Sequence, residues 1–382
     1  MGQQLDRDTL SQILEARDIA QLSFPTLIRL FQQEMAHAKV EHAKTESGAQ
    51  PGIGSGEEEL GYAGVRDPRS KDYTLFNPAR ARRPHDNEPK RDRVRQGEQR
   101  CIICQGQTTG VVDVADLSAG FTFINKNLYP VLTPLSAERR LGNDERCPYG
   151  FHFVQWTSSL HDRDWHNMPL SDCITVMQRL AALERKLLLE GRAFWPSVTP
   201  DDMPGFASIL KNYGRLVGGS LVHGHQQIVF SNIMPRRVLD DQHFEHMHGE
   251  PFSAYLLREN PAELLLRDYG PAVLVVPYFM RRPYDMMLLV KDTRKRYLHA
   301  LTAAEIAATA EGWQDAIGAI RRIMPRVGRE TAYNVITHNG PGAGLYFEFL
   351  PYTQEMGGLE HLGLFVCQAS PDSVAAELRH VL

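Results

Sequence analysis

The segment NYGRLVGGSLVHGHQQIVF, residues 212–230, carries the residue types best suited to chemistry in this chain. Alternate residues of a strand point to the same face, so an extended segment places His223, His225 and Gln227 on one side. The turn at 218–220, Gly-Gly-Ser, can bring backbone N–H groups close to an anion. An imidazole beside such a turn can attack phosphorus and carry the transferred group as a phosphoramidate. The alternative is two ordinary hydrogen-bonded histidines in a half-buried strand, and the combination with Gln227 and the turn favours the chemical role.

Cys101 and Cys104 form a CxxC pair, which can be half of a zinc site, a redox pair or two buried thiols without metal. A redox pair of the thioredoxin type opens a helix after a strand, whereas the turn-rich QGQTTG follows here. A zinc site needs two further ligands, and His161 and His223 are the candidates. These four residues would give a closed tetrahedral Cys₂His₂ set.

Further polar residues lie where a nucleotide could be bound. The arginines of NPARARRP, Arg80, Arg82 and Arg83, suit bidentate contacts to phosphate, although a solvated charge cluster is the better explanation when they are taken alone. Asn125 lies between apolar residues in FTFINKNLYP and could contact a base or a ribose, or could belong to a turn. The sequence leaves both alternatives open.

From about residue 148 the chain reads as a duplicated unit of strand, helix, strand and strand. The first unit has a long helix in CITVMQRLAALERKLLLEG, and the second has one in IAATAEGWQDAIGAIRRIM. Ser171, and Thr302 with Glu305, are the predicted helix starts. A repeat of this length indicates a duplicated domain rather than a solenoid.

The two copies differ at the strand that carries the polar residues. The first copy has His223 and His225 there, and the second has Tyr346 and Glu348. Since the first copy alone keeps the imidazoles, we expect the chemistry there. His338 and Glu348 could flank a second metal in the other copy, although satisfied polar residues of a strand are the simpler interpretation.

The organisation that follows has three parts. Residues 1–60 form a helical extension and linker, with two helices between 5 and 45 and then the Gly-, Ser- and Glu-rich ESGAQPGIGSGEEELG. Residues 61–235 form the first half, which opens with a short strand at Tyr73–Phe76 and a basic arm. Residues 236–382 form the second half.

Composition excludes several classes of protein. A length of 382 residues predicts two or three domains at about 150 residues each. The net charge of −4 provides no basic field for nucleic acid, and no run of 18 apolar residues predicts a membrane span. The first residues, MGQQLDRDTLSQ, lack the apolar core of a signal peptide, and five cysteines are a sparse, odd set. We therefore expect a cytoplasmic protein.

Taken together, the motifs resemble those of the galactose-1-phosphate uridylyltransferase family, a branch of the histidine-triad superfamily. The resemblance covers about residues 66–382 and keeps the order of the family's motifs. The segments that carry it are RDPRSKDYTLFNPARARRP, CIIC, FTFINKNLYPVL, TSSLHDRDW, GGSLVHGHQQI, GPAVLVVPYFMRRPYDMMLLVK, and YFEFLPY with SPDSVAAELR.

This resemblance implies an α+β fold of two histidine-triad-like halves, each an antiparallel sheet with helices on one face, after an N-terminal helical extension. It makes His225 the nucleophile that accepts a nucleoside monophosphate, and Gln227 the glutamine that hydrogen-bonds the phosphoryl group. The substrate-binding residues that it implies are Arg80, Arg83, Asn125, Asn212, Gly219 and Ser220. The structural zinc ligands that it implies are Cys101, Cys104, His161 and His223. Family members act as homodimers, so a dimer is expected here.

The activity implied is transfer of UMP or AMP from an activated donor to hexose 1-phosphate or phosphate, with ping-pong kinetics. Transfer of UMP to galactose 1-phosphate is the main expectation. Gly224 stands where the family has proline, and the short loop TQEMGGLEHLG lacks the usual sugar-phosphate-binding segment. That loop favours the alternative, an adenylyltransferase or phosphorylase acting on ADP-glucose, diadenosine tetraphosphate or adenylyl sulfate. A hydrolase is disfavoured by Gln227, which cannot activate water, and an inactive zinc-stabilised nucleotide-binding protein is the non-enzymatic alternative.

Overall fold

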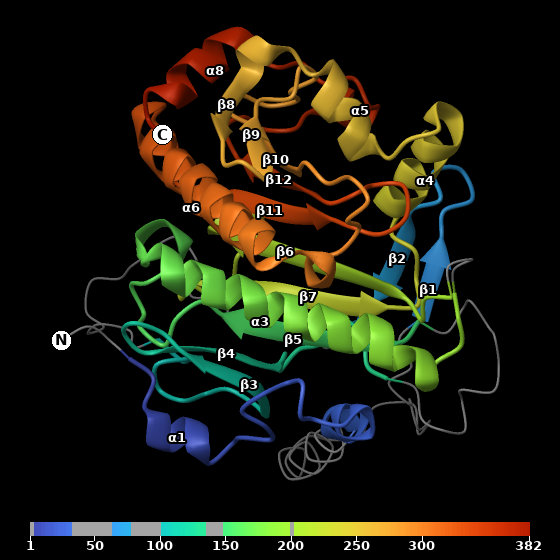
Figure 1. The fold of residues 1–382 in the computed structure, drawn as a ribbon, viewed down its shortest axis with the longest axis vertical. Helices are drawn as coiled ribbons and strands as arrows, with labels where there is room; N and C mark the ends of the chain where they lie inside the picture. The colour runs from blue at the N-terminus through green and yellow to red at the C-terminus, as the bar shows by residue number, and fades with distance from the viewer. Residues whose placement is uncertain (1–3, 33–62, 78–100, 135–147, 199–201) are drawn as a thin grey trace, which may run out of the picture.

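A computed structural model describes residues 4–32, 63–77, 101–134, 148–198 and 202–382 (Figure 1). Most of the predicted linker and basic arm, including Arg80, Arg82 and Arg83, lie outside the described residues. The short strand predicted at Tyr73–Phe76 is present as β2, and it pairs with β1 (Ala63–Arg66) as an antiparallel hairpin.

The described residues form one ten-stranded sheet in which each pair of neighbouring strands is antiparallel. From one edge to the other, its strands are β3 (Val111–Asp116), β4 (Phe121–Lys126), β5 (Gly150–Trp156), β7 (His225–Ser231), β6 (Phe206–Tyr213), β11 (Tyr333–His338), β12 (Tyr346–Pro351), β10 (Met286–Val290), β9 (Ala272–Val275) and β8 (Leu265–Asp268). The first five strands come from the predicted first half and the last five from the second. The halves therefore share one sheet, and they join where β6 pairs with β11.

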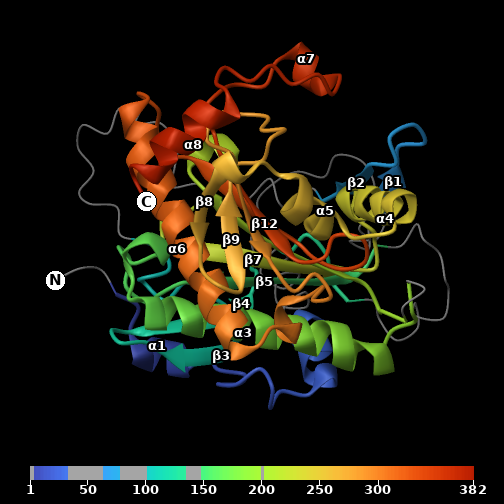
Figure 2. The ribbon, with the colours of Figure 1, turned by 45° about the horizontal axis from the view of Figure 1, so that its top comes forward.

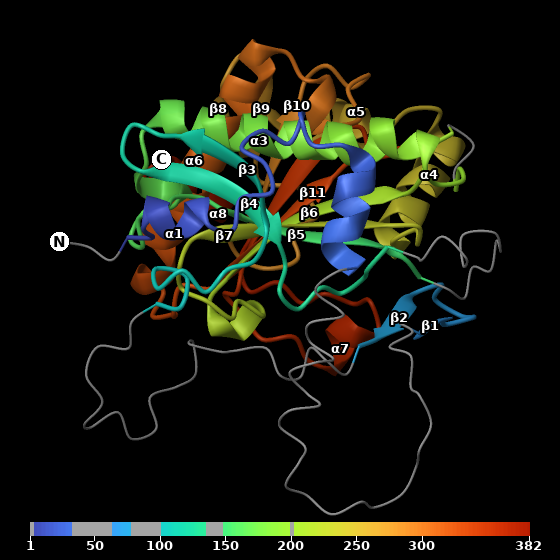
Figure 3. The same cartoon turned by 90° about the horizontal axis from the view of Figure 1, so that it is seen from below.

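Two long helices, α3 (Leu170–Leu189) and α6 (Ala303–Arg326), pack against each other and cover one face of this sheet (Figures 1 and 2). The remaining helices are α1 (Arg7–Ser11), α4 (Arg236–His248), α5 (Phe252–Glu259), α7 (Gly358–His361) and α8 (Pro371–Arg379). Short 3₁₀ turns lie at η3 (Trp165–Asn167), η4 (Glu190–Ala193), η5 (Arg215–Val217), η6 (Ala262–Leu264) and η7 (Leu298–Ala300). Seen from below, α7 and the β1–β2 hairpin lie on the side of the sheet away from α3 (Figure 3).

This architecture confirms the predicted α+β class with an antiparallel sheet and helices. The prediction for the start of α6 is also confirmed, because Thr302 and Glu305 form a reciprocal capping box. The prediction at Ser171 is wrong by two residues, since α3 begins at Leu170 and Pro169 takes the capping position. Proline is accepted there because the first N–H groups of a helix have no partner within it.

The N-terminal residues pack onto the first half of the sheet. Leu5 and Leu10 are buried beside Phe121 and Trp156 on the face opposite α3. A second helical stretch, 24–32, buries Phe31 in the main core, where its ring packs edge-on against aromatic residues of β5. The boundaries at residues 60 and 235 remain predictions. Within the described ranges, no helix combines the length and apolar character needed to cross a bilayer.

Candidate functional site

His225 opens β7, a strand inside the sheet between β5 and β6. On the neighbouring residue Gln226, the side chain bonds to Gln155, whose own amide donates to a carbonyl of α3. Because neighbouring residues of a strand point to opposite faces, His225 and Gln227 face away from the helices. The predicted shared face is therefore present for these two residues.

His223 departs from the prediction that it shares the strand. The residue lies in the turn before β7, and no strand runs through residues 218–224. The Nδ1 atom of His225 lies 2.8 Å from the backbone oxygen of His223, so Nδ1 is the nitrogen that donates. The Nε2 atom of His225 then carries the free lone pair. Burial, together with the nearby ammonium of Lys211, lowers the pKa of His225 to about 4 and keeps the ring neutral.

The amide of Gln227 is oriented by His152 on β5. The Nδ1 atom of His152 accepts the backbone N–H of Val131 at 3.1 Å, so its Nε2 must carry the hydrogen. This Nε2 lies 3.0 Å from Oε1 of Gln227 and donates to it. The nitrogen of Asn127 is 3.1 Å from the same Nε2 but, as a donor, cannot accept that hydrogen. The NH₂ group of Gln227 is consequently available to an anion.

The turn predicted to offer its N–H groups to an anion uses two of them internally, because Gly218 donates to the Arg215 carbonyl at 3.2 Å and Gly219 to the Gly214 carbonyl at 3.0 Å. Gly218 has a φ of +83°, in the left-handed region that favours glycine. A Cβ atom on Gly219 would lie 2.8 Å from the backbone nitrogen and oxygen of Gly214. Ser220 follows and is almost buried. Gly219 also packs against the backbone of Asn212 at the end of β6, so the structure brings the turn and Asn212 together.

Asn125 lies near this site, but its polar atoms are used within the protein. Its Oδ1 accepts the indole N–H of Trp156 at 2.8 Å, and its Nδ2 donates to the Lys126 carbonyl at 2.7 Å and to Thr109 at 3.2 Å. A contact between Asn125 and a nucleoside would replace one of these bonds. Its role in binding therefore stays a prediction, as do those of Arg80 and Arg83, which lie outside the described residues.

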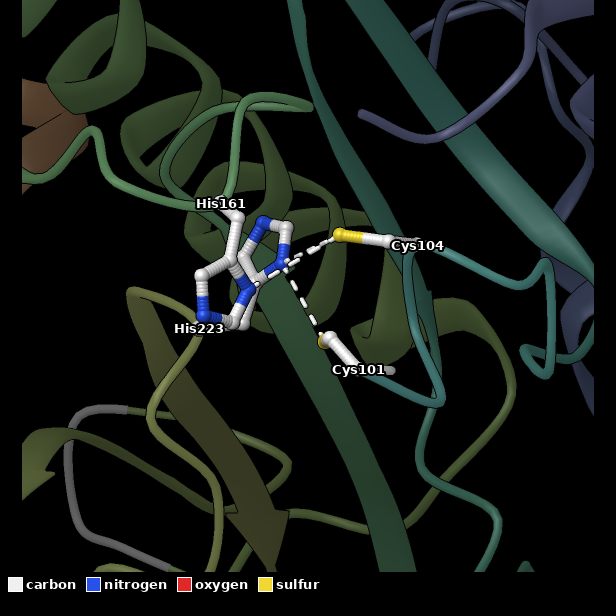
Figure 4. Close-up of side chains that lie close together, drawn as sticks. All are labelled: Cys101, Cys104, His161 and His223. Carbon is white, nitrogen blue, oxygen red and sulfur yellow. Dashed lines mark hydrogen bonds between the residues drawn. The ribbon is translucent and has the colours of Figure 1, made fainter. Parts of the chain in front are cut away.

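The four predicted metal ligands come together at one end of β7 (Figure 4). The Nδ1 atom of His223 lies 3.7 Å from Sγ of Cys101 and 3.6 Å from Sγ of Cys104, and Nδ1 of His161 lies 3.8 Å from Cys104. A tetrahedral zinc ion with ordinary bond lengths would separate sulfur and nitrogen ligands by about 3.6 Å. The donor set and its spacing fit zinc.

The surroundings of His223 and Cys101 also suit a metal. The Nε2 atom of His223 lies 2.7 Å from the carbonyl oxygen of Ser158 and donates to it, which leaves Nδ1 as the ligand atom. A hydrogen bond from Cys104, together with the neighbouring His223, lowers the pKa of the Cys101 thiol to about 3. This shift favours the thiolate of Cys101, the form that binds metals.

His338 and Glu348, the second candidate metal pair, contact each other directly. The Nε2 atom of His338 lies 2.8 Å from Oε2 of Glu348, and the ring of Tyr346 stacks on His338 with centroids 4.3 Å apart. Burial alone would raise the pKa of Glu348, but the neighbouring His338 holds it at about 2. The two residues are hydrogen-bonded to each other, in agreement with the simpler interpretation.

The structure adds residues that no local motif indicated. Lys211, fully buried, places its Nζ 2.8 Å from Oδ2 of Asp164 and 3.0 Å from the backbone oxygen of His225. Asn334, on β11, bonds to Asn212 across the junction of the two halves. These residues, like His152, act through partners far away in sequence, so spacing along the chain gave no signal for them.

No family model matches this chain. In sequence, it is 22% identical to an ADP-glucose phosphorylase of Arabidopsis thaliana over 347 residues, which cover 83% of this chain and 92% of that protein. Among solved structures, it is similar to a uridylyltransferase, with a TM-score of 0.63, 21% identity, and coverage of 83% and 97% of the two chains. An Arabidopsis thaliana ADP-glucose phosphorylase solved with bound ADP-glucose gives a TM-score of 0.60 at 18% identity, with coverage of 84% and 98%. The likenesses to these solved structures confirm the predicted fold.

Proposed function

We propose that the chain is a member of the galactose-1-phosphate uridylyltransferase-like family and that it transfers AMP from an ADP-sugar to inorganic phosphate through a covalent intermediate on His225. Nucleotidyl transfer in general follows from the relatives, whereas the donor, the acceptor and the roles of individual residues belong to the proposal. The observation that carries it is the bond from His225 Nδ1 to the His223 carbonyl. This bond leaves the free lone pair of the ring on Nε2.

The choice of AMP over UMP rests on sequence. The relative that spans 83% of this chain is named for ADP-glucose phosphorolysis. The loop after β12 is short and lacks the sugar-phosphate-binding segment expected for transfer to a hexose 1-phosphate. Both points favour the adenylyl alternative over the UMP transfer that the motifs first suggested. Transfer of UMP to hexose 1-phosphate remains the second candidate, on the likeness in fold to a uridylyltransferase.

In the first half-reaction, the lone pair of His225 Nε2 forms a bond to the α-phosphorus of the donor. The bond from that phosphorus to the bridging oxygen breaks, and the sugar 1-phosphate leaves with the bridging oxygen and the electron pair. The amides of Gln227 and Asn212 are the side-chain donors that we assign to the phosphoryl oxygens. Such donors stabilise the charge that develops there.

In the second half-reaction, an oxygen of inorganic phosphate attacks the same phosphorus. The P–N bond breaks, its electron pair returns to Nε2, and ADP is released. Gln227 can donate to the phosphoryl group but cannot remove a proton from water, so transfer is favoured over hydrolysis. Two successive displacements give ping-pong kinetics.

Zinc is the proposed occupant of the Cys101, Cys104, His161 and His223 cluster, where it would supply structural cross-linking of three chain segments rather than chemistry on the substrate. His223 would thereby fix the carbonyl that orients His225.

The test offers ADP-glucose, UDP-glucose and adenylyl sulfate, each labelled in the nucleotide, with and without inorganic phosphate. We expect label from ADP-glucose on the protein that is stable in alkali and lost in acid, and release of labelled ADP when phosphate is added. His225→Asn should abolish labelling, while His243→Asn, an exposed histidine of α4, should label normally. Preferential labelling by UDP-glucose would overturn the adenylyl choice, and no labelling by any donor would favour a nucleotide-binding protein without activity.

A further inference from the structure

Asn212 and Asn334 face each other where the two halves of the sheet join. They are cross-strand partners of β6 and β11, 122 residues apart in sequence. The Nδ2 atom of Asn334 lies 2.7 Å from Oδ1 of Asn212 and 3.2 Å from the backbone oxygen of Val217. Val217 ends the 3₁₀ turn that leads into the glycines at 218 and 219.

The contact to Val217 determines how both amides are turned. A backbone carbonyl can only accept, so the atom of Asn334 that approaches it must be the amide nitrogen. This nitrogen also approaches Asn212, which must therefore present its oxygen as the acceptor. The NH₂ group of Asn212 is left pointing away from Asn334, and the orientation follows from hydrogen bonding alone.

Asn212 lies on the face of the sheet that carries the nucleophile. Leu210 of β6 is paired with Gln227 of β7, and Asn212 follows Leu210 by two residues, which returns it to the same face. The oxygen and the nitrogen of an amide have opposite effects on an anion, because the nitrogen donates to phosphate while the oxygen repels it. An unrestrained asparagine side chain samples both orientations.

We infer that Asn334 is a positioning residue for the nucleotide site: it holds the amide of Asn212 with its NH₂ group toward the phosphoryl group. The second half of the chain thus completes the first half's site through the sheet junction, without contact between Asn334 and the substrate. The inference rests on the proposed function for the identity of the anion, a nucleoside phosphate.

Asn334→Asp tests this directly, since it keeps the size of the side chain and removes its donor. Asn212 must then turn round to donate to the new carboxylate, and its oxygen faces the phosphate. We expect the rate of protein labelling by ADP-glucose to fall about 100-fold, the usual cost of losing one oxyanion donor. Asn334→Ala leaves Asn212 free to adopt either orientation, so we expect a smaller fall, about 10-fold. A larger fall in labelling rate for Asn334→Asp than for Asn334→Ala is an order that loss of packing would not produce.

Two controls isolate the mechanism. In an Asn212→Ala background, adding Asn334→Asp should lower the labelling rate by less than a further 3-fold. Direct repulsion between the new carboxylate and the substrate would persist in that background and would lower the rate as much as in the wild type. Asn260→Asp is the matched variant, because Asn260 also donates to a backbone oxygen, that of Val276 at 3.1 Å, in the second half but away from the site. It should label at the wild-type rate.

Calorimetric binding of ADP to each variant separates this inference from the proposed function. If the wild type binds ADP but is never labelled, the proposed transfer fails. The inference is then tested by ADP affinity, which should be lowest in Asn334→Asp, intermediate in Asn334→Ala and highest in the wild type. Wild-type labelling and affinity in Asn334→Asp would overturn the inference. So would an equal loss in the Asn212→Ala background, and so would absence of ADP binding by the wild type.

Discussion

The Nδ1 atom of His225 is hydrogen-bonded to the backbone oxygen of His223 at 2.8 Å. One residue of the candidate metal cluster therefore orients the candidate nucleophile through the main chain, two positions along. Any change that lets the segment before β7 relax would move the acceptor of this bond. The position of the candidate nucleophile therefore depends on the metal cluster, even though no metal ligand needs to touch the substrate.

Removal of the metal should lower both stability and labelling. We expect the purified protein to contain about one zinc per chain, and we expect prolonged dialysis against a chelator to reduce the melting temperature and the rate of labelling together. Cys101→Ser should lose most of the metal, while Cys367→Ser, a cysteine outside the cluster, should keep it. The zinc content of the wild type, Cys101→Ser and Cys367→Ser is measured by elemental analysis. Equal zinc in wild type and Cys101→Ser would contradict the assigned ligands.

Loss of His152 should weaken the phosphoryl contact of Gln227 without removing the nucleophile. Because His152 donates to Oε1 of Gln227, His152→Ala frees this amide to rotate. We expect single-turnover labelling by ADP-glucose to slow about 10-fold, in keeping with one neutral hydrogen bond of about 1 kcal/mol. In a Gln227→Ala background the same change should add little. Additive losses in the double variant would mean that His152 acts by another route.

The buried pair of Lys211 and Asp164 should be needed for stability behind β7. Lys211→Met leaves Asp164 without its cation in a site that excludes water, and breaking a buried pair in this way costs about 3–5 kcal/mol. Urea unfolding should show this loss, and Lys211→Met combined with Asp164→Asn should recover part of it. A Lys211→Met protein as stable as the wild type would contradict the role given to the pair.

Local patterns in the sequence predicted much of this molecule. Helices α3 and α6 repeat their apolar residues at helical spacing, and Thr302 with Glu305 marks the start of α6, so both were predictable. His225 and Gln227 alternate as strand residues do, and the CxxC spacing indicated half of the metal cluster. Each of these signals depends on residues that are neighbours along the chain.

The remainder depends on register between distant strands. Asn334 reaches Asn212 because β11 pairs with β6, and a shift of one residue would turn Asn334 to the other face. His223 was assigned to the strand by alternation, but its ring bonds to Ser158 and approaches the two cysteines, and these contacts take it out of the sheet. A single sequence contains the strands but not their order, so such contacts could not be predicted from it.

Asp285 should make the protein less stable as the pH rises from 5 to 8. Burial raises the pKa of this carboxyl from 3.8 to about 7, even though the backbone N–H of Arg282 donates to it at 3.1 Å. A carboxyl whose pKa is higher in the folded state stabilises the fold when protonated, and this contribution is lost progressively between pH 3.8 and about 7. The shift corresponds to about 4 kcal/mol in the free energy of unfolding over the whole interval between the two pKa values, at about 1.4 kcal/mol for each pKa unit. Asp285→Asn, which cannot ionise, should therefore gain stability relative to the wild type between pH 5 and pH 8. Urea unfolding at both pH values measures this difference, and parallel pH dependence in the two proteins would show that Asp285 is ionised in the fold at pH 5.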